Sequence, residues 1–328
     1  MSEHNLERKA FSRRTVLKAS ALAAASGLVS STGFGPLVAR ASDSALKLGS
    51  FSVAIDYAPY LIAKAKGDFN AVQGGGTPEY TTFQSLPPIN EALATDAIDF
   101  VFEAEPPALI GKAAGIDVKI VGISCSLVQE ILVPVDSKVQ TAADLKDAKI
   151  AVLAGTSSHY GVIKIIGEAG LKPSDVQIID MIPPDAKSAF ETGQVDAWAV
   201  WPPFVEQEEL AGIGRVLPKG DALIHSIMAV RGKFAADNPD KVKKMVSILN
   251  ATKSWMIENP AEAMAIVAKE LDIPLAVVER AWPRHDWAAT IDEAVIADMQ
   301  SKADFLYESK YVTTKVNVAN DAVDLSYL

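Results

Sequence analysis

Cysteine is nearly absent from this sequence. Cys125 is the only one among 328 residues, which excludes an internal disulfide and any metal site built from several cysteines. The sequence also lacks the spacing of His, Cys, Asp and Glu that is typical of zinc or calcium sites. No ordered set of Ser, His and Asp indicates a hydrolase. These absences predict a protein with no metal, no cofactor and no catalytic residues.

Positive charge is also scarce. Lys and Arg number 31 against 41 Asp and Glu, so the formal net charge is −10. This balance, together with the lack of a basic run in the body of the chain, argues against a nucleic-acid-binding protein. The glycines at 74–76 lack the spacing of a phosphate-binding loop and are typical of a turn. With 49% hydrophobic residues, the chain is long enough for two domains with cores.

The apolar run near the N-terminus, Ala19–Val29, is too short to span a membrane. It follows a twin-arginine signature, Ser12–Lys18, and precedes an Ala-x-Ala site at Ala39–Ala41. This order predicts that residues 1–41 are a twin-arginine signal peptide and that the mature protein, starting near Ser42, resides in the periplasm. The segment holds six Lys/Arg and two Asp/Glu, so its removal changes the net charge from −10 to −14.

The middle of the chain alternates strands with helices. Strands are predicted at Lys149–Leu153, Val176–Met181 and Val195–Val200, and the helices between them end near Gly170 and Gly193. This alternation predicts parallel strands joined by right-handed crossovers, with ligands bound at the carboxyl ends of the strands. The residues that follow those ends are Thr156, Ser157, Ser158, His159, Asp185 and Trp201.

A second series of strands and helices precedes this stretch, and after residue 238 the pattern is helical to the end. Acidic residues follow the strand ends here too: Asp56, which is next to Tyr57, then Glu103 and Glu105. The extended segments Ile131–Val135 and Ile227–Arg231 are predicted to be the two crossings between the α/β units.

Several motifs resemble one family. They are Gly155–Tyr160, Gly170–Val176, Asp185–Phe190, Gly193–Trp201 and Ala303–Glu308. Together they resemble the periplasmic binding proteins for aliphatic sulfonates and taurine, in the nitrate/sulfonate/taurine group of ABC importers. The resemblance covers essentially the whole mature chain.

The resemblance implies a type II periplasmic binding protein, an α/β fold of two lobes with a ligand cleft between them. Each lobe would be a βα sheet with flanking helices. The first lobe would comprise residues 42–133 with 228–328, and the second residues 134–227. It also implies a monomer that delivers a small solute to the transmembrane permease.

The predicted ligand-binding residues divide into two groups of opposite character. The helix start at Thr156–His159 offers N–H and O–H donors to an oxyanion such as sulfonate. Asp56, Glu103 and Glu105 would repel a purely anionic ligand and suit one that also carries an ammonium group, as taurine does. Trp201 could pack on the ligand's alkyl chain or cation. The complete set is Asp56, Tyr57, Glu103, Glu105, Thr156, Ser157, Ser158, His159, Asp185 and Trp201.

Other functions remain open at this point. A receptor of the same fold could take nitrate, an aromatic acid, or a pyrimidine or amine solute. A desulfinase with this fold uses a cysteine nucleophile, but Cys125 lacks the matching His and Arg context, and lone cysteines are most often small core residues. Arg284 and His285 lie near a basic position of the sulfonate-binding relatives, without a clear match.

Overall fold

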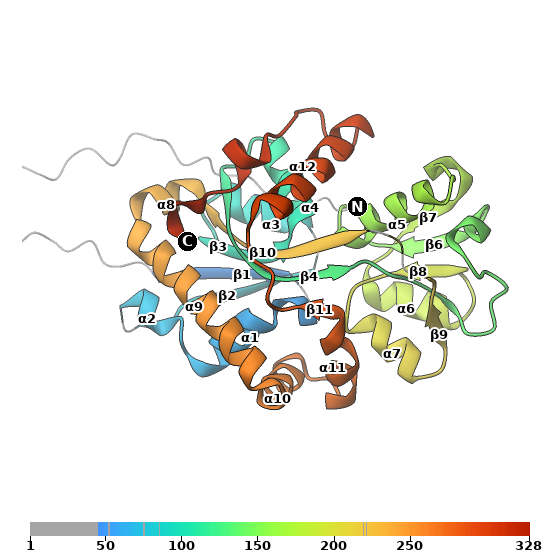
Figure 1. Cartoon of the computed structure of the whole chain (residues 1–328), viewed down its shortest axis with the longest axis horizontal. Coiled ribbons are helices and arrows are strands. Elements are labelled where there is room, and N and C mark those ends of the chain that lie inside the picture. Colours follow the sequence, from blue (N-terminus) through green and yellow to red (C-terminus); the bar gives the residue numbers. More distant parts are fainter. Residues whose placement is uncertain (1–44, 52, 75, 85, 219, 221) are drawn as a thin grey trace, which may run out of the picture. The chain divides into compact units, whose positions relative to one another are not determined.

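A computed structural model describes two β-sheets flanked by helices (Figure 1). The described residues are 45–51, 53–74, 76–84, 86–218, 220 and 222–328. The predicted signal peptide, residues 1–41, lies outside them. No helix in these ranges combines the length and apolar composition needed to cross a membrane. The predicted α/β class is confirmed.

The first sheet has the strand order β11-β4-β10-β3-β1-β2. Its strands are β1 (Lys47–Phe51), β2 (Glu79–Phe83), β3 (Phe100–Ala104), β4 (Val118–Val128), β10 (Leu223–Arg231) and β11 (His285–Asp286). β1 lies between β2 and β3 and is parallel with both, whereas β10 runs antiparallel between β3 and β4. Because β1 and β3 are parallel, their carboxyl ends meet at the same edge of the sheet.

The second sheet has the order β7-β6-β8-β5-β9. Its strands are β5 (Ile131–Pro134), β6 (Lys149–Val152), β7 (Gln177–Asp180), β8 (Ala197–Ala199) and β9 (Gly214–Val216). β6 is parallel with β7 and β8, and β5 is antiparallel with β8 and β9. The three strands predicted from the middle of the chain are therefore present, and they are parallel as expected.

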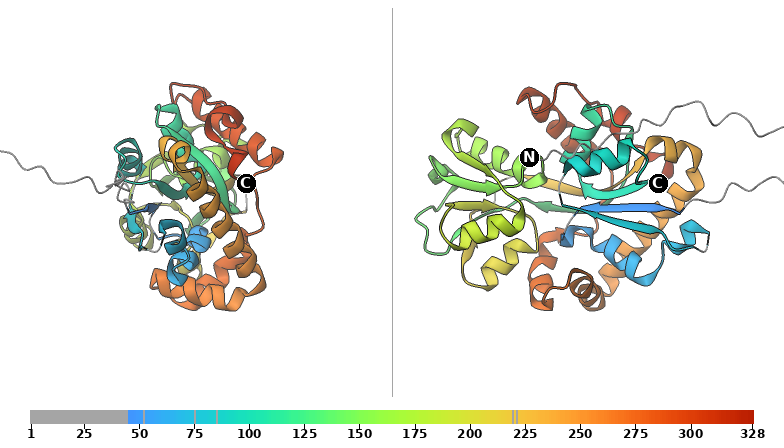
Figure 2. Two further views of the ribbon diagram at one scale, coloured as in Figure 1. Left: turned by 90° about the vertical axis from the view of Figure 1, so that its left-hand side faces the viewer. Right: turned by 180° about the vertical axis from the view of Figure 1, so that it is seen from behind.

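Helices cover both faces of each sheet (Figures 1 and 2). On the first sheet, α9 packs against β4 and α1 on one side, while α12 packs on α4 at the other. On the second sheet, α5 covers one face, and α6 and α7 cover the other (Figure 1). The helices are α1 (Ala58–Lys66), α2 (Asn70–Gln73), α3 (Leu86–Ala94), α4 (Glu105–Ala113), α5 (Ser157–Glu168), α6 (Pro183–Glu191), α7 (Phe204–Leu210), α8 (Gly232–Asp237), α9 (Pro239–Glu258), α10 (Pro260–Leu271), α11 (Leu275–Ala281) and α12 (Glu293–Glu308).

The apolar face of α5 packs this helix against β6. Val162, Ile165 and Ile166 are buried in one cluster with Ile150 and Val152 of β6. Burying such side chains stabilises the packed helix by roughly 1.5–3 kcal/mol each. Since α5 follows β6 after a short turn, its N-terminus lies just beyond the carboxyl end of that strand.

The chain passes between the sheets twice, at positions that differ from the predicted crossings. Ile131–Pro134 is β5 and pairs within the second sheet, and Ile227–Arg231 belongs to β10 of the first. The crossings are instead the short connection at 129–130 and the one between the end of β9 and the start of β10. Both predicted segments are extended, as expected, because each pairs along its length with neighbouring strands. The lobe limits given above stay a prediction.

Candidate functional site

Strand ends from both sheets surround one small cavity. The first sheet contributes the end of β1, residues shortly after it and the end of β3, and the second contributes the turn after β6 and the second residue after β8. The lining residues are Phe51, Asp56, Tyr57, Glu103, Ala104, Pro107, Thr156, Ser157 and Trp201. Six of the ten predicted ligand-binding residues thus lie together. The cavity volume, about 10 Å³, is close to the room that one water molecule needs.

The N-terminus of α5 supplies donors to this cavity. Thr156 is the N-cap residue: its hydroxyl donates to Leu153 O (2.7 Å) and accepts from His159 N (3.4 Å). The first N–H groups of a helix have no acceptor within the helix, and the helix dipole places partial positive charge there. Ser157, at the first helical position, lines the cavity. This wall therefore favours a negatively charged group.

Glu103 is the most unusual group on the opposite wall. Its side chain is 1% exposed, and neither carboxylate oxygen has a hydrogen-bond partner among the described residues. Burial raises the pKa of this carboxyl to about 8. A buried carboxylate without a partner is costly, so the group stays protonated near neutral pH unless a cation approaches it.

Asp56 lines the cavity too, but the protein already holds it. Its Oδ1 lies 3.1 Å from Nε2 of His285, and its Oδ2 accepts from the Ser226 hydroxyl (3.4 Å). The other ring nitrogen, Nδ1 of His285, is 2.9 Å from the Ala281 carbonyl, which can only accept. Nδ1 must therefore carry hydrogen, and the contact between Nε2 and Asp56 requires a second proton. Unlike Glu103, Asp56 thus has hydrogen-bonding partners within the protein.

Trp201 joins the two walls. Its indole N–H donates to Val53 O (2.9 Å), just after β1, and its ring meets the edge of the Phe51 ring with centroids 5.4 Å apart. Both side chains are largely buried. The indole therefore forms an apolar closing surface across the cavity, between the donor wall and the acidic wall.

Comparison with known proteins identifies the family. The sequence profile of the NMT1-like family matches residues 39–271. The chain belongs to the NMT1-like family. A Bacillus subtilis relative, named as an aliphatic sulfonates-binding protein, is 33% identical over 278 residues, covering 82% of this chain and 83% of its own length.

Solved structures agree with this NMT1-like assignment. The alkanesulfonate-binding protein SsuA from Xanthomonas axonopodis, bound to MOPS, superimposes with a TM-score of 0.75 and 26% identity, covering 86% of this chain and 98% of that one. The chain therefore has the two-lobed fold of the periplasmic binding proteins. A desulfurisation enzyme, DSZB, shares the fold with a TM-score of 0.68 at 16% identity, so the fold alone does not separate binding from catalysis.

Glu105, predicted to contact the ligand, is not part of the cavity lining in this NMT1-like chain. It is fully buried, is ion-paired with Lys302, and accepts from His225 N (2.9 Å). Lys302 also donates to Asp298 (2.5 Å). Burial opposes ionisation of Asp298, but the hydrogen bond from His225 and the charge of Lys302 lower its pKa to about 2.

Ligand atoms of Glu105, His225 and Asp298 lie close enough together to surround a metal ion. The Lys302 ammonium already donates to both carboxylates in this cluster. An internal cation therefore provides the positive charge that a metal would supply, and Glu105 has the environment of a structural ion pair.

Three more predicted residues lie away from the cavity. Ser158 is fully buried, and its hydroxyl has no partner in the described ranges. His159 accepts from Gly155 N through Nδ1 (3.2 Å), and burial lowers the pKa of its ring. It lines a separate cavity of about 230 Å³ between α5 and α12, beside Tyr311. Asp185 is exposed in the first turn of α6.

The cysteine of the enzyme hypothesis is buried behind Asp56. Cys125 is fully buried, and its thiol donates to Asp56 O (3.4 Å). Burial, followed by the nearby charge of Asp56, raises the pKa of this thiol well above its usual value. A thiol in this environment is a poor nucleophile, since the thiolate is the reactive form.

Sequence reasoning missed three residues that line the cavity, one of them Ala104, and left the role of His285 undecided. Phe51 and Pro107 are the other two, and His285 contacts Asp56 from outside the cavity lining. Phe51 could have been found, since it is the last residue of β1 at the edge where ligands bind. The partner of Asp56 could not, because His285 is 229 positions away in the sequence.

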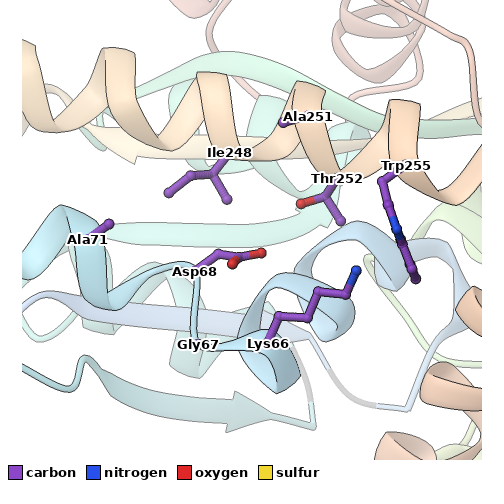
Figure 3. Close-up of a pocket in the computed structure, with 8 residues that line it drawn as sticks. All are labelled: Lys66, Gly67, Asp68, Ala71, Ile248, Ala251, Thr252 and Trp255. Carbon is purple, nitrogen blue, oxygen red and sulfur yellow. The ribbon is translucent and has the colours of Figure 1, made fainter.

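A larger hollow elsewhere on the first sheet's helices lacks these features. Figure 3 shows the groove between the end of α1 and α9, about 560 Å³ in volume. Lys66 extends along it toward Trp255 and lies over the indole ring, and Asp68 and Thr252 provide its other polar groups (Figure 3). No strand end reaches this groove, and it contains no set of converging donors.

Proposed function

We propose that this protein is the solute-binding subunit of an ABC importer, and that it captures a small organosulfonate in the periplasm for delivery to the permease. The observation that carries the proposal is the α5 N-terminus, with Thr156 and Ser157, at a cavity enclosed by strand ends of both sheets. The sulfonate specificity named for the relatives supports the same ligand class.

Binding would work by closure of the two lobes around the solute. The solute adds contacts with both walls only in the closed arrangement, so its binding shifts the population toward that arrangement. The cavity of about 10 Å³ holds no organosulfonate as it stands, so entry requires the walls to separate. Micromolar affinity, roughly −8 kcal/mol, is a reasonable expectation for a small solute whose polar atoms are all paired.

The moving bodies would be the predicted lobes, residues 42–133 with 228–328 and residues 134–227, with β5 and β10 assigned to the sheets in which they pair. The protein would act as a monomer, with the permease subunits as its partners. A binding role rather than catalysis is supported by the burial and raised pKa of the Cys125 thiol.

Replacing Ser157 tests the position of the sulfonate. We expect Ser157→Ala to weaken binding of ethanesulfonate by roughly 1–3 kcal/mol, the cost of a lost hydrogen bond to a charged group. Titration calorimetry measures this change. Ser158→Ala is the matched control, because the Ser158 hydroxyl is buried outside the cavity lining; its affinity should stay within about threefold of wild type. Equal affinities in all three proteins would place the anion elsewhere.

Export by the twin-arginine pathway is proposed from the sequence alone. Replacing both Arg13 and Arg14 by Lys should leave the precursor in the cytoplasm, because this pathway requires the arginine pair. Immunoblots of periplasmic and cytoplasmic fractions measure the distribution. A variant that still reaches the periplasm in undiminished amount would show that another export route reads this signal.

One observation favours a second candidate within the same fold. The unpaired Glu103 suits a cationic group, so a receptor for an amine solute without any sulfonate is the alternative. A thermal-shift screen with ethanesulfonate, taurine, ethylamine and nitrate separates the two. Stabilisation by ethylamine but by neither sulfonate would replace the sulfonate proposal with the amine receptor.

A further inference from the structure

Arg284, which lies beside the first sheet, contacts carboxylates on α7 of the second sheet and in the connection between the two sheets. It ends the 3-10 turn η4 (Trp282–Arg284), directly before β11 of the first sheet. Its Nη1 donates to Glu130 (2.5 Å) and lies 3.1 Å from Glu206, and its Nη2 donates to Glu209 (2.6 Å).

The three carboxylates lie on two elements, a helix of the second sheet and a link between the sheets, whose positions would change if the lobes moved apart. Glu206 and Glu209 are on α7, which packs against β9 of the second sheet and against α11 (Figure 1). Glu130 lies in the short connection between β4 and β5, one of the two links between the sheets. One guanidinium therefore joins the first sheet's C-terminal segment to both the second sheet and the link.

Burial makes these contacts stronger than surface ion pairs. The side chain of Glu206 is 0% exposed, that of Glu130 is 6% exposed and that of Arg284 is 19% exposed. Buried charges are screened little by salt, and their attraction is larger than in water. Burial raises the pKa of Glu206 to about 7, and the charge of Arg284 opposes this rise and favours the ionised carboxylate.

The same short segment reaches the solute cavity. His285 follows Arg284 directly and contacts Asp56 of the cavity wall (3.1 Å). The pairing of His285 with Leu127 in the first sheet fixes the backbone between the two side chains. A segment of two residues thus touches the cavity on one side and α7 on the other.

We propose that Arg284 is a closure clamp, which holds Glu130, Glu206 and Glu209 in the closed arrangement of the two lobes and thereby slows release of the bound solute. The proposed clamp affects how readily the two lobes separate and does not determine which solute binds. Contacts made only in the closed state stabilise that state and leave the encounter with solute unchanged. Their loss should therefore increase the dissociation rate much more than it changes the association rate.

Arg280 provides a matched control on the same segment. It contacts Glu209 (3.0 Å) and is 44% exposed, so its ion pair is a surface pair of little value. We expect Arg284→Gln to raise the dissociation rate of taurine at least tenfold, and Arg280→Gln by less than about threefold. Stopped-flow tryptophan fluorescence measures both, since Trp201 lies between the walls of the cavity.

A double variant separates clamping from simple neutralisation of a buried charge. Arg284→Gln alone leaves Glu206 without its cation, whereas Arg284→Gln with Glu206→Gln removes both charges. A clamp predicts that the double variant still releases taurine at least tenfold faster than wild type. A wild-type rate in the double variant, or in Arg284→Gln itself, overturns the proposal. Circular dichroism and thermal unfolding establish that each variant is folded.

A measurement without solute keeps the test independent of the proposed function. Spin labels at Lys172→Cys and Lys243→Cys, both exposed and on opposite sides of the links, report the separation of the lobes; Cys125 is buried and will not label. Arg284→Gln should shift the solute-free distance distribution toward longer distances, and Arg280→Gln should not. If taurine does not bind at all, this measurement alone decides, and an unchanged distribution overturns the clamp.

Discussion

Taurine should bind this protein more tightly than ethanesulfonate by about 2 kcal/mol or more, roughly thirtyfold in affinity. The two solutes share the sulfonate and the two-carbon chain, and they differ in the ammonium group. Closure on ethanesulfonate leaves the Glu103 carboxyl group buried without a partner. The taurine ammonium, by contrast, can donate a hydrogen bond to this carboxylate. Leaving one buried group unpaired costs roughly 1–3 kcal/mol, and more when it is charged. Calorimetry at pH 8, near the pKa of Glu103, measures the difference.

Glu103→Gln is the isosteric test of that assignment. The amide cannot balance the ammonium charge, so the preference for taurine should shrink to less than about threefold. Asp56→Asn is a less useful variant, since it would also disturb the contact with His285. Equal affinities of wild type for the two solutes would show that Glu103 does not meet the ligand, and would leave the sulfonate proposal intact.

The pH dependence of the preference follows from the same carboxyl. With a pKa of about 8, Glu103 is mostly protonated at pH 6 in the solute-free protein, and taurine must displace that proton. The preference for taurine should therefore increase as the pH rises from 6 to 8, because Glu103 loses its proton over this range while an aliphatic ammonium stays charged. Ethanesulfonate, which needs no carboxylate, should show no such increase.

Glu103 should also affect the stability of the solute-free protein. Its folded-state pKa is raised, so its contribution to stability is complete below the ordinary value of 4.5 and is lost as the pH rises toward about 8. Glu206 titrates in an overlapping range, with a pKa of about 7. Comparison of wild type with Glu103→Gln isolates the first group, since the loss that Glu103 causes is absent from the variant.

The sequence predicted the cavity's location because that location depends on local patterns. Alternating strands and helices place strand ends at one edge, and the residues just after those ends included Asp56, Tyr57, Glu103, Thr156, Ser157 and Trp201, all of which line the cavity. The sequence did not separate the four consecutive polar residues after β6, all of which were predicted to bind the ligand. Thr156 and Ser157 line the cavity, whereas Ser158 is buried outside the lining and His159 accepts from Gly155 N in its own loop.

The predictions that could not be made from the sequence concern residues whose environment depends on contacts with distant parts of the chain. Glu105 looked equivalent to Glu103, two positions away on the same strand end, but Lys302 of α12 meets one and not the other. Asp185 sits in the first turn of α6, where acidic residues are common, and nothing in its local pattern indicated that this turn is exposed. The limits of the second sheet depended likewise on the partners of β5 and β10.

Lys302→Met should lower the free energy of unfolding by roughly 3–5 kcal/mol, because it leaves Glu105 buried without its cation. Urea unfolding at pH 7 measures the change. Lys233→Met is the control: Lys233 pairs with Asp237 on an exposed helix surface, and its loss should change the unfolding free energy by less than about 0.5 kcal/mol. A loss below about 1 kcal/mol in Lys302→Met would show that Glu105 finds other compensation.

The double variant Lys302→Met with Glu105→Gln then decides the role of Glu105. Removing both charges should restore most of the lost stability, since replacing a buried pair by uncharged groups of similar size is often nearly neutral. If Glu105 only supports the fold, taurine affinity in this folded variant should stay within about threefold of wild type, because Glu105 is not among the residues that line the cavity. A loss of tenfold or more would mean that Glu105 reaches the solute in the bound state. Glu103 would then share the ammonium with a second carboxylate that the solute-free structure holds against α12.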